Sequence, residues 1–180
     1  MVDNINFLEE KQVLKNIENN IKCDIIDNHG EEFYIVYNRA LNILSYRINF
    51  EYELKKKLLN KNFKEEVVDS VITYLKEENL INDYETSKFY IETQKEKLSK
   101  MKIIKKLKSN HVRQSIIDDV LNLFDFDAID DILNIAYKKL NFYDNITVKE
   151  INKVLGYLYR NGYSISDINK VKKELYKKLK

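Results

Sequence analysis

Apolar residues recur along this chain in a pattern that appears three times. Each copy is anchored on an apolar residue that follows a short polar break; the anchors are Phe63, Val112 and Tyr163, offset by 49 and then 51 residues. Positions nine and five residues before each anchor, and five, eight and twelve after it, are also apolar. Because residues spaced by three or four share one helical face, each copy is predicted to hold two amphipathic helices joined near the anchor. The flanking apolar sets are Leu54, Leu58, Val68, Val71 and Leu75; Ile103, Leu107, Ile117, Val120 and Phe124; and Val154, Leu158, Ile168, Val171 and Leu175.

A third helix is predicted before this pair in each copy. The expected ranges are Phe33 to Arg47, Asp83 to Lys97 and Asp127 to Leu140. The predicted fold class is therefore all-α, with three tandem three-helix repeats that form an extended curved array. The predicted domains are residues 31–80, 81–125 and 126–180 for the three repeats, preceded by an N-terminal segment, 1–30. In that segment the pattern leaves two alternatives: Leu14, Ile17 and Ile21 allow a helix, and Ile21, Cys23 and Ile25 allow a strand.

Local signals at the expected helix ends agree with this division. Thr147 with Glu150 is typical of a capping box at a helix start. Gly162 is placed to end the preceding helix, and Ser164 to open the last one. Gly156 instead falls inside a predicted helix, where we expect it to permit close approach of a neighbouring helix.

Composition supports helices and limits the function classes. The chain has no proline and only three glycines, too few turn residues for an all-β or doubly wound fold. A single cysteine permits no internal disulfide and suits a reducing compartment. No apolar run reaches the length of a membrane span, and the N-terminus lacks the basic start of a signal peptide. We therefore expect a cytoplasmic protein with no membrane partner.

The sequence contains no recognisable catalytic or metal-binding constellation. No Walker A loop or G-x-S-x-G elbow is present, and His29 and His111 lack further ligands at zinc spacing. Adjacent aspartates, as at Asp118 with Asp119, point about 100° apart on a helix and do not converge on one ligand. The chain is predicted to be no enzyme, with no cofactor and no metal.

Charge is distributed in blocks although the net charge is only +2. From Lys95 to Gln114 there are eight Lys or Arg residues and one acidic residue, whereas Ser115 to Tyr137 carries six aspartates and no Lys or Arg. On a helical wheel from Lys95 to Lys108 the lysines are expected opposite the apolar arc. Two interpretations of this face stay open: a solvated lysine-rich surface, or a contact with an acidic protein or nucleic-acid phosphates.

Tyrosines near Arg160 raise the question of base stacking. Tyr157, Tyr159 and Tyr163 cluster there in sequence. Tyr163 is a repeat anchor, however, so we expect most of these rings to pack in the core.

Several of these segments, in order and spacing, resemble the RecX family. Ala40-Leu41, Leu44-Ser45-Tyr46-Arg47, Glu53-Leu54 and Leu58 are similar to the family's AL..LSYR......EL...L opening. Leu80-Ile81-Asn82-Asp83 resembles the family's junction between the first two repeats. Leu158 to Ser164 resembles the family's closing segment. The similarity spans residues 33 to 175.

The resemblance implies a protein that binds filaments of the recombinase RecA and inhibits RecA ATPase and strand exchange in recombination, DNA repair and the SOS response. RecA is the implied partner, single-stranded DNA is a further candidate, and a monomer is expected. A free-standing helical nucleic-acid-binding protein is the alternative. The expected partner or phosphate contacts are Lys95, Lys102, Lys105, Lys106 and Arg113, with Arg160, Lys170 and Lys173 as a second strip.

Overall fold

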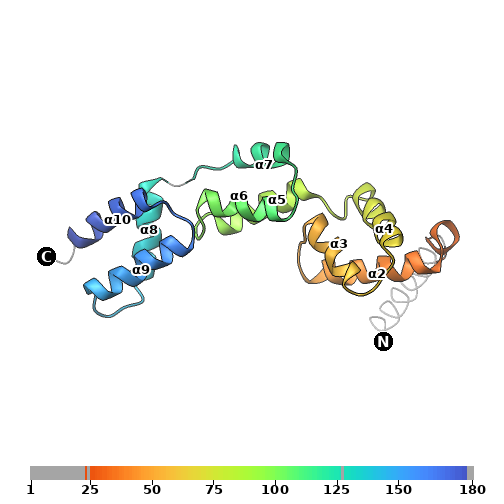
Figure 1. Ribbon diagram of the computed structural model, residues 1–180, viewed down its shortest axis with the longest axis horizontal. Coiled ribbons are helices and arrows are strands. Elements are labelled where there is room, and N and C mark those ends of the chain that lie inside the picture. The colour runs from red at the N-terminus through yellow and green to blue at the C-terminus, as the bar shows by residue number, and fades with distance from the viewer. Residues whose placement is uncertain (1–22, 24, 127, 178–180) are drawn as a thin grey trace, which may run out of the picture. The chain divides into compact units, whose positions relative to one another are not determined.

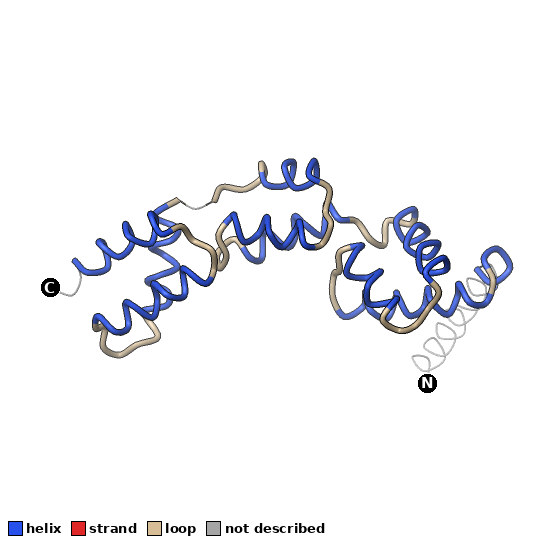
Figure 2. Tube along the Cα trace, viewed as in Figure 1, coloured by secondary structure: helices blue, strands red, loops and turns tan. Residues whose placement is uncertain are grey.

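The part of the chain that the computed structural model describes, residues 23, 25–126 and 128–177, is helical and contains no strand (Figures 1 and 2). This confirms the all-α prediction. The helices there are α2 (Glu31–Tyr46), α3 (Glu51–Leu59), α4 (Glu65–Glu77), α5 (Asp83–Gln94), α6 (Lys100–Ser109), α7 (Gln114–Leu121), α8 (Ile129–Leu140), α9 (Val148–Arg160) and α10 (Ile165–Lys177).

The helices pack in groups of three. Helices α2, α3 and α4 contact one another, as do α5, α6 and α7, and as do α8, α9 and α10. We call these groups the first, second and third bundles. The chain divides between Asn82 and Asp83 into two compact units, of which the first holds the first bundle and the second holds the other two.

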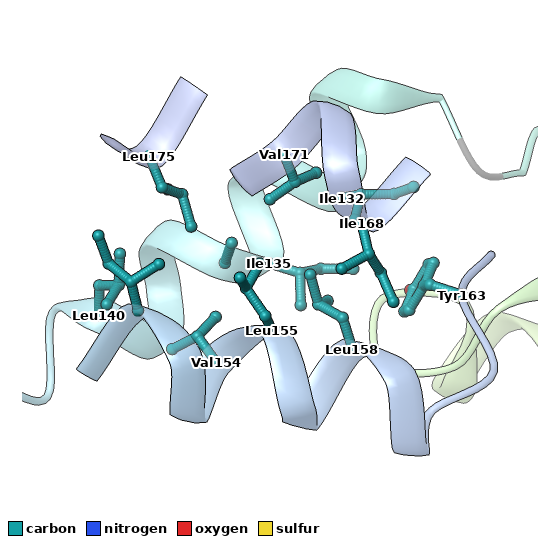
Figure 3. Packing of buried hydrophobic residues seen from close by; sticks show 12 residues of the cluster. Ile132, Ile135, Leu140, Val154, Leu155, Leu158, Tyr163, Ile168, Val171 and Leu175 are labelled. Carbon is teal, nitrogen blue, oxygen red and sulfur yellow. The ribbon is translucent and has the colours of Figure 1, made fainter. Parts of the chain in front are cut away.

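The repeated apolar positions form the bundle cores. All of them are buried except Phe63 and Phe124, which are half-buried. Figure 3 shows the third bundle, where Val154, Leu158 and Leu175 face the buried residues of α8. Phe124 departs from the pattern because α7 ends at Leu121. The predicted helix therefore stops short of the twelfth position after its anchor.

The turn before each anchor has the same backbone signature. Asn62, His111 and Gly162 have φ values of 62°, 59° and 86°. In the second and third bundles the anchor's N–H then bonds to the carbonyl of the leucine five residues earlier, an arrangement that closes a helix end. Gly162 adopts this conformation without the steric cost of a Cβ, which confirms its predicted capping role.

The predicted helix starts in the third bundle are also confirmed. Thr147 caps α9, where its hydroxyl accepts from the N–H of Lys149 at 3.2 Å and hydrogen-bonds to Glu150. Ser164 precedes α10 and accepts from the N–H of Asp167 at 3.1 Å.

Two expectations about local structure were wrong, at the end of α5 and at Gly156, and one alternative that the sequence left open is decided for Cys23 and Ile25. Helix α5 ends at Gln94 rather than Lys97, and the chain breaks before α6 because Ser99 caps that helix. Cys23 and Ile25 are helical, which excludes the strand interpretation for them, and Ile25 is buried in the core of the first bundle. Apart from the backbone of α9 itself, the only atom of the described residues within 4 Å of a Cβ on Gly156 would be Nη1 of Arg160, so no other described helix approaches that glycine. Leu14, Ile17 and Ile21 lie outside the described residues.

No helix in the described part of the chain combines the length and apolar character that a membrane crossing requires.

Candidate partner interface

Helix α6 carries the central part of the predicted cationic surface. Ile103 and Leu107 are fully buried on one side of it, and Lys105, two residues from each, is exposed on the other. Lys106 is half-buried, so the expectation that it lies opposite the apolar face was wrong. Lys95 is not on this helix at all, because the chain turns between Gln94 and Lys100. The helical wheel drawn from Lys95 to Lys108 therefore included residues 95–99, which do not belong to α6.

Lys102 has a structural contact that the sequence did not indicate. Its Nζ donates to the carbonyl of Arg160 at 2.6 Å, and Ser99 Oγ donates to the carbonyl of Gly162 at 2.7 Å. The N–H of Ser99 also donates to the carbonyl of Asn161 at 3.0 Å. These bonds join the start of α6 to the end of α9. Lys102 therefore supports the packing of the second bundle on the third, whereas the sequence analysis placed it only as a partner or phosphate contact opposite the apolar arc.

A second set of contacts joins the same two bundles near the end of α5. Lys138 Nζ lies 3.0 Å from a carboxylate oxygen of Glu96, and this hydrogen bond lowers the pKa of Glu96. Lys95 lies beside that pair, with Nζ 5.3 Å from the ring centroid of Phe124. A cavity of about 210 Å³ opens here, lined by both charge signs and by Tyr163. Lys95 is thus part of a mixed-charge junction rather than of a uniformly cationic face.

The remaining predicted contacts, Arg113, Arg160, Lys170 and Lys173, are exposed, but they come from three different helix regions. Arg113 is the N-cap residue of α7. Lys170 and Lys173 are one turn apart on α10, and Lys170 Nζ pairs with Asp167 at 3.1 Å. The hydrogen bond from Ser164, and then that from Lys170, lowers the pKa of Asp167.

The third bundle also contains a groove that the sequence analysis missed. Its lining combines the cations Lys139, Lys153 and Arg160 with aromatic rings from the turn after α8 and from α9, around an open volume of about 440 Å³. Tyr157 belongs to it, whereas Tyr163 is buried as expected and Tyr159 is exposed. A usable signal was present, because Lys153, Tyr157 and Arg160 are spaced by four and three residues on one helix.

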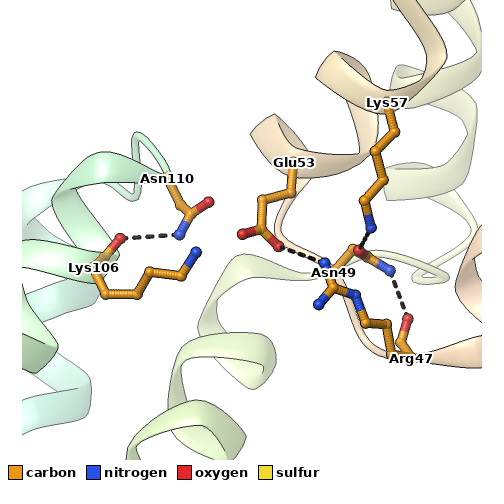
Figure 4. A network of polar contacts seen from close by, with 6 residues as sticks. All are labelled: Arg47, Asn49, Glu53, Lys57, Lys106 and Asn110. Carbon is orange, nitrogen blue, oxygen red and sulfur yellow. Dashed lines mark hydrogen bonds and ion pairs between the residues drawn. The ribbon is translucent and has the colours of Figure 1, made fainter. Parts of the chain in front are cut away.

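A polar network in the first unit gives structural roles to the residues that follow the Leu44-Ser45-Tyr46-Arg47 segment (Figure 4). The buried Asn49 donates from Nδ2 to the carbonyl of Arg47 at 2.6 Å and accepts from Nζ of Lys57. Burial, and then the nearby charge of Arg47, lowers the pKa of Lys57. Arg47 in turn lies 3.8 Å from Glu53. The network joins the end of α2 to α3, so these residues have structural roles.

The described residues hold no group of three or more His, Cys, Asp or Glu side chains placed to bind a metal ion.

Comparison with known proteins identifies the relatives of this chain. A family model described as the first three-helix domain of RecX matches residues 37–75. The regulatory protein RecX of Clostridium acetobutylicum is 30% identical over 162 residues, covering 85% of this chain and 73% of that protein. RecX of Caldanaerobacter subterraneus subsp. tengcongensis is 32% identical over 155 residues, covering 81% and 76%. The crystal structure of RecX from Lactobacillus salivarius matches with a TM-score of 0.57 at 26% identity, over 80% of this chain and 96% of that one.

These matches confirm the resemblance seen in the sequence and the tandem three-helix organisation. RecX regulatory proteins are non-enzymatic, which confirms that expectation as well. With two relatives at 30% identity or more across most of both chains, this chain belongs to the RecX family of regulatory proteins.

Proposed function

We propose that this protein binds RecA filaments in the cytoplasm and inhibits RecA ATPase and strand exchange. Membership of the RecX family supports this proposal, and one structural observation indicates which residues make the contact. Helix α6 buries Ile103 and Leu107 on one side and presents the exposed Lys105 on the other, in a stretch dominated by lysine. No packing role within the described residues accounts for that side chain.

Contacts spread over several bundles suit a filament as the partner. Each exposed lysine meets an anionic group as a point charge and contributes little alone. Several such contacts on one chain add through effective concentration when the partner repeats. We propose residues 31–80, 81–125 and 126–180 as the repeating units, acting within a monomer, with Lys105 and Arg113 among the contacts and Lys170 and Lys173 as a separate pair.

The proposal is tested by the single-strand-dependent ATPase of RecA. The wild-type protein should suppress it at low salt, and the suppression should weaken as salt screens the contact. The double variant Lys105→Glu/Arg113→Glu should need roughly 5- to 30-fold more protein for the same effect, since reversing an exposed contact costs about 0.5–1 kcal/mol. The double variant Lys56→Glu/Lys61→Glu, at two exposed lysines of the first bundle, is the charge-matched control and should act as wild type.

A wild-type protein that leaves the ATPase unchanged at low salt would contradict the proposal. Equal loss of suppression in Lys105→Glu/Arg113→Glu and in the control Lys56→Glu/Lys61→Glu would instead contradict the assignment of the surface. A free-standing nucleic-acid-binding protein is the alternative function, and the low net charge of +2 argues against it.

A further inference from the structure

The groove in the third bundle brings cations directly over aromatic rings. Lys139, near the end of α8, has its Nζ 4.7 Å from the ring centroid of Tyr157 and 5.9 Å from that of Phe142. Lys153, on α9, has its Nζ 5.3 Å from the ring centroid of Tyr143. These distances lie within the range of cation–π attraction, which holds the ammonium groups at the groove instead of out in solvent.

Helix α9 supplies one wall of the groove through residues on a single face. Lys153, Tyr157 and Arg160 follow one another at helical spacing. Nη1 of Arg160 lies 3.4 Å from the place that a Cβ on Gly156 would take, an ordinary contact distance. The arginine side chain therefore runs back along α9 beside the groove.

Charge and exposure both indicate a ligand. The described lining residues include three cations and no carboxylate. Glu150, next to the groove, pairs with Lys153 at 3.4 Å, which leaves Lys139 and Arg160 without a carboxylate partner among the described residues. Phe142 is 83% exposed, an apolar ring in water that no core contact explains. A ligand that suits this surface carries both negative charge and flat rings.

We propose that this groove binds single-stranded nucleic acid, with a base stacked on Phe142 and backbone phosphates against Lys139 and Arg160. Alternating phosphates and unpaired bases match cations interleaved with exposed aromatic rings. A duplex hides its base faces, and an acidic peptide lacks them. The site is separate from the α6 surface and gives this RecX protein a contact with the strand that does not depend on RecA.

The test is fluorescence anisotropy of a labelled oligothymidylate titrated with the full chain in the absence of RecA. Phe142→Ala should weaken binding by roughly 5- to 150-fold, the loss that removal of one stacking ring produces. Tyr159→Ala is the matched control, because Tyr159 is 64% exposed on α9 but does not line the groove. It should bind as wild type, and circular dichroism should show both variants folded.

Salt dependence provides a second readout. Each phosphate contact adds about −0.7 to the slope of log affinity against log salt for a single strand. Lys139→Gln should therefore make the slope shallower by about 0.7, whereas Lys149→Gln, exposed on α9 outside the groove, should not change it.

Three outcomes would overturn the proposal: wild-type affinity in Phe142→Ala, equal affinity for duplex and single strand, or equal affinity for a polyglutamate peptide. The last would mark the groove as a surface for acidic proteins. Because RecA is absent from the assay, failure here leaves the proposed inhibition of RecA untouched, and the reverse also holds.

Discussion

Replacing Gly162 with alanine tests how the second and third bundles are joined. At a φ of 86° an alanine costs about 1–2 kcal/mol in backbone strain. The new Cβ would also lie 2.7 Å from Ser99 Oγ and 3.1 Å from the Cβ of Lys102, inside normal contact distance. Ser99 must then move and lose its bond to the Gly162 carbonyl, worth about 0.5–1.5 kcal/mol, together with part of its capping of α6. The free energy of unfolding should fall by about 2–4 kcal/mol.

A double-mutant cycle with Ser99→Ala isolates the contact. Ser99→Ala alone removes the same hydrogen bond and cap, so adding Gly162→Ala to it should cost only the backbone strain and the smaller contact with Lys102. The two changes should therefore fall short of additivity by about 1–2 kcal/mol. Urea unfolding, monitored by circular dichroism, measures the loss of unfolding free energy in each variant. Hydrogen exchange should show that the loss is concentrated in α6 and α9. Additivity within about 0.5 kcal/mol would refute the packing described here.

Three further predictions concern stability. Truncation to alanine of the fully buried leucine five residues before each anchor should cost about 2–5 kcal/mol, and an unchanged urea midpoint would contradict the repeat alignment. The changes are made at Leu58, Leu107 and Leu158. Lys102→Glu should lower the melting temperature because it removes the bond to the carbonyl of Arg160, whereas Lys105→Glu should not; equal melting temperatures would count against the junction. Because the pKa of Asp167 is lowered in the folded protein, its ionised carboxylate stabilises the fold at pH values above 3.8, the ordinary pKa of aspartate. This contribution is lost as the pH falls through the lower pKa of the folded state. Asp167→Asn should therefore show a shallower loss of melting temperature on acidification, and an identical pH profile would contradict the assignment.

The fold could be predicted because the signal was local and repeated. Side chains at spacings of three and four, such as Leu54 with Leu58, report directly on the buried face of a helix. Caps at Thr147, Gly162 and Ser164 were also local, since each acts within a few residues of itself. The helix break at Ser99 was harder to predict, because lysines continue on both sides of it and hide the change in phase.

The interface could be predicted only in part because its geometry depends on distant residues. Lys102 bonds to Arg160 across 58 positions of sequence, and the pairing of Lys138 with Glu96 spans 42. No helical wheel contains such contacts. The groove likewise joins two helices and the turn between them, so Phe142 could be placed beside Tyr157 only once the bundle was assembled. By contrast Lys105, whose exposure follows from one helix alone, lies where the sequence predicted.

Co-sedimentation with RecA filaments, compared with bare single-stranded DNA at the same nucleotide concentration and low salt, tests the central claim most directly. If the groove of the third bundle binds single strands, some protein should sediment with bare single-stranded DNA. Recognition of the filament predicts clearly more protein pelleting with RecA present, with half-saturation at a lower protein concentration. Equal or weaker pelleting with the filament than with bare DNA would contradict the account and favour a free-standing nucleic-acid-binding protein.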